Sequence, residues 1–122
     1  MSFSALVAVG NKKGRVGIGL GKATDVATAV KKAVKYAQGN MITVAMKGTT
    51  IPHSVKIKRG AAILLIKPAP AGSGVIAGGS MRAVVEVAGV RDIVGRILGS
   101  NNKAANVYAT FEALRRLKPL EN

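Results

Sequence analysis

The segment from Arg15 to Gly21 constrains the fold of this chain more than any other. Every second residue is glycine, so a β-strand here would have one aliphatic face, with Val16, Ile18 and Leu20, and one bare face, with Gly17, Gly19 and Gly21. Glycine inside a strand weakens it and marks a place where another backbone or a ligand comes close. The segment therefore predicts a strand covered on its glycine face by either a packed helix or a ligand.

The hydrophobic pattern around this strand predicts an α+β chain in the order β-β-α-β-β-β-α-β-α. Strands are expected at residues 3–9, 15–21, 42–46, 53–58, 61–67 and 90–98, and helices at 24–39, 80–88 and from 103 to just before 119. A boundary between two small lobes is expected near residues 48–54. This gives an N-terminal lobe of residues 1–52 and a C-terminal lobe of residues 53–122.

Residue types add detail to these elements. Apolar residues at helical spacing predict the buried stripe of the first helix, Val26, Val30, Ala33, Val34 and Ala37, and of the last one, Val107, Tyr108, Phe111, Leu114 and Leu117. The continuous apolar run at 61–67 predicts a strand covered on both faces. Ser80 is expected to cap the second helix and Gly89 to end it, after a loop at 68–79.

Net charge indicates the class of partner. The 122 residues include 19 basic and 5 acidic ones, for a net charge of +14, while 48% are hydrophobic. That apolar content supports a folded core, so most of the charge lies on the surface. Such uncompensated charge favours a polyanion: nucleic acid, an anionic membrane or an acidic protein. Residues 1–60 hold 11 of the basic residues and one acidic residue, so the first lobe is expected to be the main basic surface.

Residue types that support catalysis or metal binding are scarce. Cysteine is absent, which excludes a disulfide framework, a thiolate metal site and a cysteine nucleophile. His53 is the one histidine and the acidic residues are scattered, so neither a metal triad nor a nucleophile–base pair is indicated. The longest hydrophobic run, Ala61–Ile66, is far shorter than the roughly 20 residues of a membrane helix. We expect a soluble, non-enzymatic protein of the cell interior without cofactor or metal.

Two glycine-rich segments raise the alternative of a nucleotide enzyme. The first lacks the phosphate-loop spacing, because Val16 replaces its first glycine and Ala23 replaces its Ser or Thr. The second, Gly72–Ala77, fits a loose dinucleotide pattern, and Asp92 lies 20 residues beyond Gly72. A ribose-binding carboxylate should follow the second strand, however, and Asp92 lies near the start of that strand. The other interpretation of this segment is a flexible or RNA-facing loop.

Composition also indicates which class of polyanion the chain is expected to bind. Single-strand readers stack bases on aromatic side chains, and this chain has four aromatic residues, of which Tyr108 and Phe111 fall on a predicted core stripe. Twelve lysines against seven arginines favour diffuse phosphate contact over base reading. This pattern favours folded RNA, bound through its backbone and shape. A membrane-surface protein would need bulkier apolar residues than the Val and Ala of the basic helix.

Ten ordered segments then carry a family resemblance. They are residues 3–7, 14–23, 40–41, 48–53, 67–69, 72–79, 81–83, 88–90, 99–100 and 109–110. Each is weak alone, but the set in this order is specific. Through it the sequence resembles the small-subunit ribosomal protein S5 family along essentially its whole length.

The resemblance implies a structural constituent of the small ribosomal subunit. The N-terminal lobe would resemble a double-stranded-RNA-binding domain (β-β-α-β), and the C-terminal lobe would be β-α-β-α. The implied partners are small-subunit rRNA and ribosomal proteins S4 and S8, near the mRNA path, with roles in assembly and decoding fidelity. By match, the implied rRNA contacts are Arg15, Gly17, Gly19, Gly21 and Lys22, and the residues linked to the S4 interface and fidelity are Gly78, Gly79 and Arg82.

Charge completes the candidate set. We expect most phosphate contact from Lys12, Lys13, Arg15, Lys22, Lys31, Lys35, Lys56 and Lys58. The expected location is a cytoplasmic ribosome, with an organellar one left open.

Two departures from the family pattern limit what is carried over. Family members begin earlier, with a basic strand and a Gly-Gly-Arg loop tied to spectinomycin response and the mRNA path, so the chain is expected to be a short form or a truncated stretch. Neither function is assigned to it. Lys103 also stands where proline is common, and Asn106 falls about one place late.

Overall fold

The computed structural model describes residues 1–119 and confirms the α+β class. Its elements are β1 (Phe3–Gly10), β2 (Arg15–Ala23), α1 (Val26–Gly39), β3 (Ile42–Thr43), β4 (Val55–Arg59), β5 (Ala62–Pro68), β6 (Val75–Ile76), α2 (Gly79–Ala88), β7 (Ile93–Ile97) and α3 (Lys103–Arg115). The order matches the expected one, with one short strand, β6, added inside the expected loop at 68–79.

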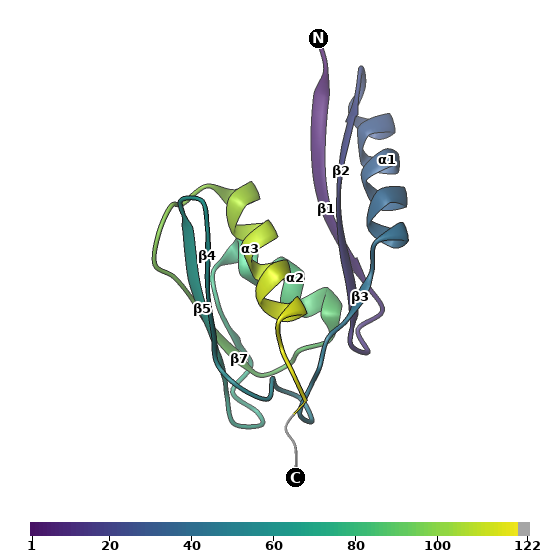
Figure 1. Cartoon of the computed structure of the whole chain (residues 1–122). Coiled ribbons are helices and arrows are strands. Elements are labelled where there is room, and N and C mark those ends of the chain that lie inside the picture. The colour runs from purple at the N-terminus through teal and green to yellow at the C-terminus, as the bar shows by residue number, and fades with distance from the viewer. Residues whose placement is uncertain (120–122) are drawn as a thin grey trace.

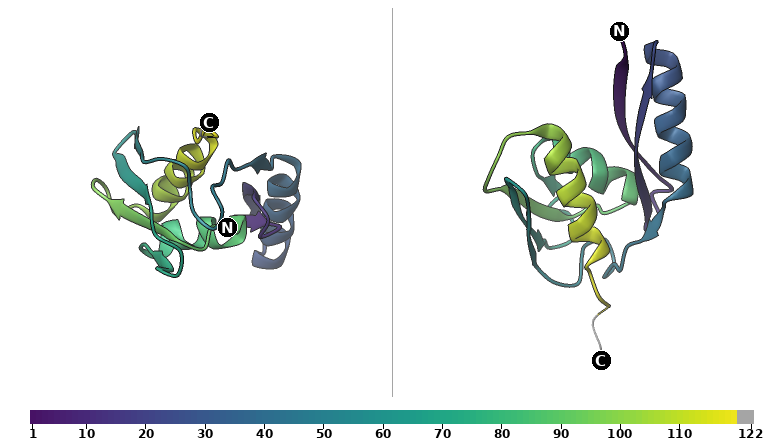
Figure 2. Two further views of the ribbon diagram at one scale, coloured as in Figure 1. Left: turned by 90° about the horizontal axis from the view of Figure 1, so that it is seen from below. Right: turned by 45° about the horizontal axis from the view of Figure 1, so that its top comes forward.

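The elements form four layers, which Figures 1 and 2 show from three directions. One sheet has the strand order β1-β2-β3 and the other has the order β4-β5-β7-β6. Helix α1 covers the outer face of the β1–β2 pair, while α2 and α3 lie between the two sheets (Figure 1). Within residues 1–119, no helix covers the outer face of the second sheet.

The glycine face of β2 packs directly on α1. A Cβ atom added at Gly17, Gly19 or Gly21 would overlap a carbonyl oxygen of that helix. The helix meets this face with residues four apart, all completely buried: Ala29, Ala33 and Ala37. Four residues of a helix advance about 6 Å along its axis, and two residues of a strand advance about 6.8 Å. Because these two repeats are similar in length, each successive alanine of α1 lies opposite a successive glycine of β2. Of the two roles left open for the glycines, the structure shows helix packing.

This contact corrects the predicted stripe of α1. Ala33 and Ala37 are buried as expected, but Val26 and Val30 are 56% and 37% exposed, and the buried face also includes Ala29. The reason is size, because a valine side chain would hold the helix away from the bare strand. The helix begins where expected, since the Asp25 carboxylate accepts hydrogen bonds from the N–H and hydroxyl of Thr28. The Thr28 N–H contributes most to lowering the pKa of Asp25.

One hydrophobic core joins the two sheets. Val16 on the aliphatic face of β2, Ile51 in the connection, Leu64 on β5 and Met81 on α2 belong to the same buried cluster. The chain between the lobes thus contributes to a shared core. The division at residues 52 and 53 stays a prediction.

Three of the expected strands, 42–46, 53–58 and 90–98, are shorter than predicted, and in the first and last of them loop contacts take up an end. The strand expected at 42–46 is confined to Ile42–Thr43, because the Val44 N–H donates to Gly14 in the β1–β2 turn. The strand expected at 90–98 begins only at Ile93, because the N–H groups of Arg91 and Asp92 donate to the Thr49 carbonyl.

Burial on β5 and the start of α2 also differ from expectation. Burial alternates along β5, with Leu64 and Ile66 buried and Leu65 half-buried, because helices cover one face only. Ser80 lies inside α2, whose N-cap is Gly78, so the predicted cap was wrong. The helix ends as predicted at Gly89, which has a φ of 94°.

The predicted stripe of α3 was wrong in part. Leu114 and Leu117 are buried, but Val107, Tyr108 and Phe111 are only half-buried. Small and polar residues form much of the buried face instead: Asn106, Ala109, Thr110 and Ala113. Because α3 lies between β4, β5 and α2, small residues allow close approach on that side. The larger rings are turned towards the first lobe.

The glycine–alanine contact predicts a sharp difference between two substitutions. Gly19→Ala should lower the free energy of unfolding by about 1–3 kcal/mol, because its methyl group would overlap the Ala33 carbonyl. Gly39→Ala, at the open end of α1, should be neutral or stabilise by up to about 1 kcal/mol. Urea titration followed by far-UV circular dichroism measures both. Equal midpoints for the two variants would contradict this packing.

Candidate nucleic-acid interface

The first basic surface lies on α1 and the end of β2. Its members are exposed lysines, Lys22, Lys31, Lys32 and Lys35, and we call them the α1 face. Lys32 Nζ donates to the Lys22 carbonyl at 3.3 Å, which joins the strand end to the helix. Asp25, the one acidic residue among residues 1–60, is engaged as the helix cap. Three of these four were predicted as contacts, and the structure brings them together.

The glycines of β2 lie beneath this surface and not on it. Gly17, Gly19 and Gly21 are buried under α1, although the resemblance implies that they contact rRNA. A ligand on the α1 side would meet the helix first. Their position supports an indirect role, in which they set the distance between α1 and the sheet.

The β1–β2 turn forms a second basic surface. The side chains of Lys12, Lys13 and Arg15 are exposed there, and we call them the turn face. The Asn11 carboxamide oxygen accepts from the N–H groups of Lys13 and Arg15 at 2.8 and 3.0 Å. Lys12 has a positive φ of 57°, and its N–H donates to Val87 at the end of α2. The second lobe thus fixes the turn in place.

A third basic surface covers the open side of the second sheet. Lys56 and Lys58 point outward from β4, while Val55 and Ile57, which alternate with them, are buried. Lys56 pairs with Leu65 on β5, which in turn pairs with Arg96 on β7, so all three share one face. Lys67 lies two residues along β5 on the same side. We call this set, Lys56, Lys58, Lys67 and Arg96, the outer sheet face.

Arg96 was missed from the sequence because the pairing of β5 with β7 could not be derived from it, and Lys67 was missed because its strand was expected to be covered on both faces. Figure 1 shows α1 and the β4–β5 pair on opposite sides of the molecule. The predicted contacts therefore form three surfaces and not one continuous patch.

The predicted protein-interface residues lie together at the start of α2. Gly78 caps the helix and Gly79 is its first residue, and both are exposed. Arg82, one turn later, pairs with Glu86 through Nε and Oε1 at 2.7 Å. Ile76, just before them, is 56% exposed. This end of α2 thus combines a small backbone surface, an apolar side chain and an arginine.

Comparison with protein-family models identifies the chain. Residues 1–45 match the model for the N-terminal domain of ribosomal protein S5, and residues 57–122 match the model for its C-terminal domain. The chain belongs to the ribosomal protein S5 family. That family has a structural role in the small ribosomal subunit and in translation, and the location is the ribosome.

The carboxylates of Glu86 and Glu112 in this S5-family chain pair with arginine and not with lysine. In the part of the chain that the structure describes, three ion pairs occur, and all use arginine: Arg82–Glu86, Arg115–Glu112 and Arg116–Glu112. The hydrogen bond from Arg115 is the main cause that lowers the pKa of Glu112. The same bond raises the pKa of Arg115. The lysines of the three basic surfaces make no ion pair within residues 1–119.

Asp92 binds the glycine-rich loop of its own chain. One carboxylate oxygen accepts from the N–H groups of Gly72 and Gly74 at 3.1 and 2.9 Å, and the other accepts from the Thr49 hydroxyl. These bonds, that of Thr49 first and that of Gly74 next, lower the pKa of Asp92. The loop N–H groups that a nucleotide phosphate would need are thus already used. Asp92 ties the loop to the connection between the lobes.

His53, the remaining candidate for a catalytic or metal-binding role, is engaged in a structural hydrogen bond. His53 Nε2 accepts from the Lys118 N–H at 3.1 Å and so holds the chain that follows α3. Among residues 1–119, no three His, Asp or Glu side chains cluster in a way that could hold a metal ion. None of the helices in that range is long and apolar enough to cross a membrane.

The Asp92 bonds predict a pH-dependent effect. Asp92→Asn should lower stability at pH 7, because the carboxylate that accepts three hydrogen bonds is lost. A lowered folded pKa stabilises the protein above the unfolded value of about 3.9, and this contribution is lost as pH falls through the folded value. The gap between parent and variant should therefore narrow in acid. Urea midpoints at pH 7 and pH 3 measure it.

Glu86→Gln provides the control, because the pair that Glu86 makes with Arg82 is solvent-exposed and contributes only about 0.3–0.5 kcal/mol, so its stability gap should stay small at both pH values. A stability gap for Asp92→Asn that is the same at both pH values would contradict the role given to the carboxylate.

Proposed function

We propose that this chain binds folded small-subunit rRNA through phosphate contacts on its three basic surfaces and does so as a structural protein, not an enzyme. One observation carries the proposal: the lysines of these surfaces are exposed, and none makes an ion pair within residues 1–119. Lysine is a compact charge that contacts phosphate without reading bases. Folded RNA offers such phosphates in a fixed arrangement.

The positions of the surfaces support a role in assembly. The α1 face and the outer sheet face lie on opposite sides of a chain with one shared core (Figure 1). One RNA helix cannot meet both faces at once, so we infer that two separate rRNA segments do. A rigid protein between them would hold their relative position. The assignment to a cytoplasmic ribosome stays a prediction.

Salt dependence tests the phosphate contacts. If about six cations neutralise phosphates, log K against log[salt] should have a slope near −5, at roughly −0.9 per contact. The double variant Lys31→Ala/Lys35→Ala should have a slope of about −3.6, because four contacts at roughly −0.9 each remain. Filter binding or fluorescence anisotropy with small-subunit rRNA, over about 50 to 200 mM KCl, measures both slopes.

Lys103→Ala is the matched control, because Lys103 is an exposed lysine outside the three surfaces. The slope of the Lys103→Ala variant should stay near −5, because all of the roughly six contacts remain. An affinity independent of salt, or equal slopes for the double variant and the parent, would contradict the proposal.

A second part of the proposal concerns protein neighbours and fidelity. We infer that the start of α2 contacts ribosomal protein S4, as the family resemblance implies for Gly78, Gly79 and Arg82, and that S8 is a further neighbour. The exposed Ile76 beside two exposed glycines supports a protein contact there. The Arg82–Glu86 pair is solvent-exposed and worth only about 0.3–0.5 kcal/mol, so Arg82 can pair with an acidic group of a neighbour instead.

Arg82→Glu should weaken association with S4 on the rRNA and change the misreading rate of ribosomes that carry it, because the charge at the contact is reversed. The salt slope of the free chain on rRNA should not change. Pull-down with S4 and a misreading reporter measure the two effects. If S4 binding and the misreading rate are both unchanged, the start of α2 is not the contact with S4.

A further inference from the structure

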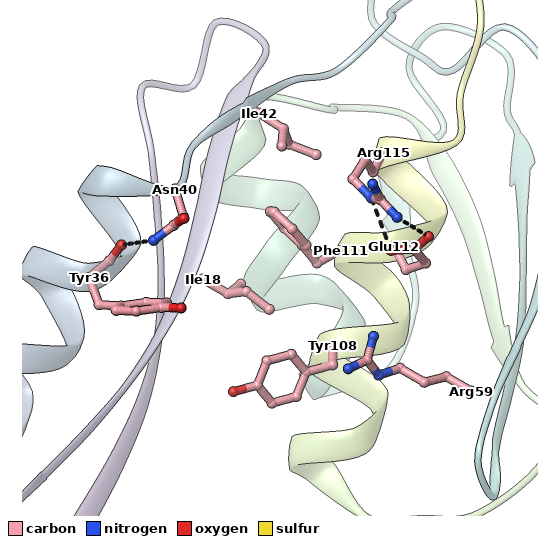
Figure 3. Close-up of a pocket in the computed structure, with 9 residues that line it drawn as sticks. All are labelled: Ile18, Tyr36, Asn40, Ile42, Arg59, Tyr108, Phe111, Glu112 and Arg115. Carbon is pink, nitrogen blue, oxygen red and sulfur yellow. Dashed lines mark hydrogen bonds and ion pairs between the residues drawn. The ribbon is translucent and has the colours of Figure 1, made fainter.

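A cleft between the lobes combines aromatic rings with arginines. It has a volume of about 390 Å³, within the roughly 300–1,000 Å³ of small-ligand sites. α1, β2 and β3 line one side, and α3 and the end of β4 line the other (Figure 3). The cleft belongs to none of the three basic surfaces. Neither family match assigns it a role.

The cleft gathers most of the aromatic residues of the chain. Of the four aromatic side chains, three line it: Tyr36, Tyr108 and Phe111. Tyr36 is 61% exposed, and the other two are half-buried. Figure 3 shows Tyr36 and Tyr108 projecting towards the same space from opposite lobes. Tyr108 and Phe111, which the sequence predicted to be in the core, are thus available with Tyr36 to a planar ligand.

The charged lining consists of two arginines, Arg59 and Arg115, and one glutamate, Glu112. Arg59 lies over the Tyr108 ring, 5.4 Å from its centroid, and Arg115 is held by Glu112. No lysine lines the cleft, in a chain with twelve lysines and seven arginines. Arginine stacks on aromatic planes and pairs with phosphate through a planar fork, whereas lysine does neither as well. This lining is therefore suited to a ligand that has both a flat ring and a phosphate.

We propose that the cleft binds one unpaired base of an RNA strand. The base stacks on the tyrosines, and its phosphate lies against Arg59 or Arg115. The inference rests on the proposed rRNA binding, which supplies the strand. It adds to that function a second mode of contact, because the basic surfaces meet phosphates and this cleft meets a base. An apolar side chain of a protein neighbour would not engage the Arg59 guanidinium, whose contact in the cleft is the Tyr108 ring.

Tyrosine fluorescence reports on the cleft directly, because the chain has no tryptophan and both of its tyrosines line the cleft. The full chain is titrated with an adenine-containing RNA ten-mer and with an abasic ten-mer of equal charge, with free tyrosine amide correcting for absorbed light. The base-bearing strand should quench the emission and bind more tightly. Each stacked base is worth about 1–3 kcal/mol, or roughly 5- to 150-fold in affinity.

Variants separate stacking from folding. Tyr36→Ala and Tyr108→Ala should each remove part of the preference for the base-bearing strand, while Tyr108→Phe should retain it because the ring is kept. Phe3→Leu, an aromatic change outside the cleft, is the control. Far-UV circular dichroism confirms that each variant is folded.

The outcomes also distinguish this inference from the proposed function. Equal affinity for the two ten-mers without quenching overturns the base site and leaves phosphate binding intact. Failure to bind either ten-mer or small-subunit rRNA overturns both. Tighter binding of the base-bearing strand that Tyr36→Ala and Tyr108→Ala do not weaken would place the base elsewhere and also overturn the proposal.

Discussion

The contact between the glycine face of β2 and the alanine face of α1 is the constraint on which the first lobe depends. With a side chain at Gly17, Gly19 or Gly21, the helix could not approach the strand, since a Cβ would overlap its carbonyl oxygens. The close approach buries the helix through alanines alone, which leaves its longer side chains for the surface. The lysines of the α1 face are among them. The glycines thus support the basic surface by lying beneath it.

Much of this arrangement follows from patterns within single elements. The alternation from Arg15 to Gly21 predicted both the strand and the close approach, and Asp25 and Gly89 predicted one start and one end of a helix correctly. Predictions based on the spacing of apolar residues were less successful. Val26, Val30 and Tyr108 are apolar or aromatic residues at helical spacing, but they are exposed or half-exposed, because α1 and α3 each pack through small residues. A hydrophobic stripe does not reveal how closely the neighbouring element lies.

Contacts between residues far apart in the sequence were the second feature that could not be predicted. Lys56 and Lys58 were recognised as outward-facing from their own strand, but Arg96 joins them only because β7 pairs with β5. The partners of Asp92 were equally hidden, since Thr49 is 43 residues away and the loop glycines are some 20 residues away. The same spacing that suggested a ribose-binding carboxylate belongs to a carboxylate that binds its own loop. Sequence distance alone could not distinguish these two uses.

The central claim is that the lysines on opposite sides of this S5-family chain contact rRNA at the same time. Lysine acetylation of the complex with small-subunit rRNA, mapped by mass spectrometry, tests it most directly. The account predicts that Lys31, Lys35, Lys56 and Lys58 are protected in the complex relative to the free chain, while Lys103 stays reactive. Protection of one face only, or of neither, would contradict it.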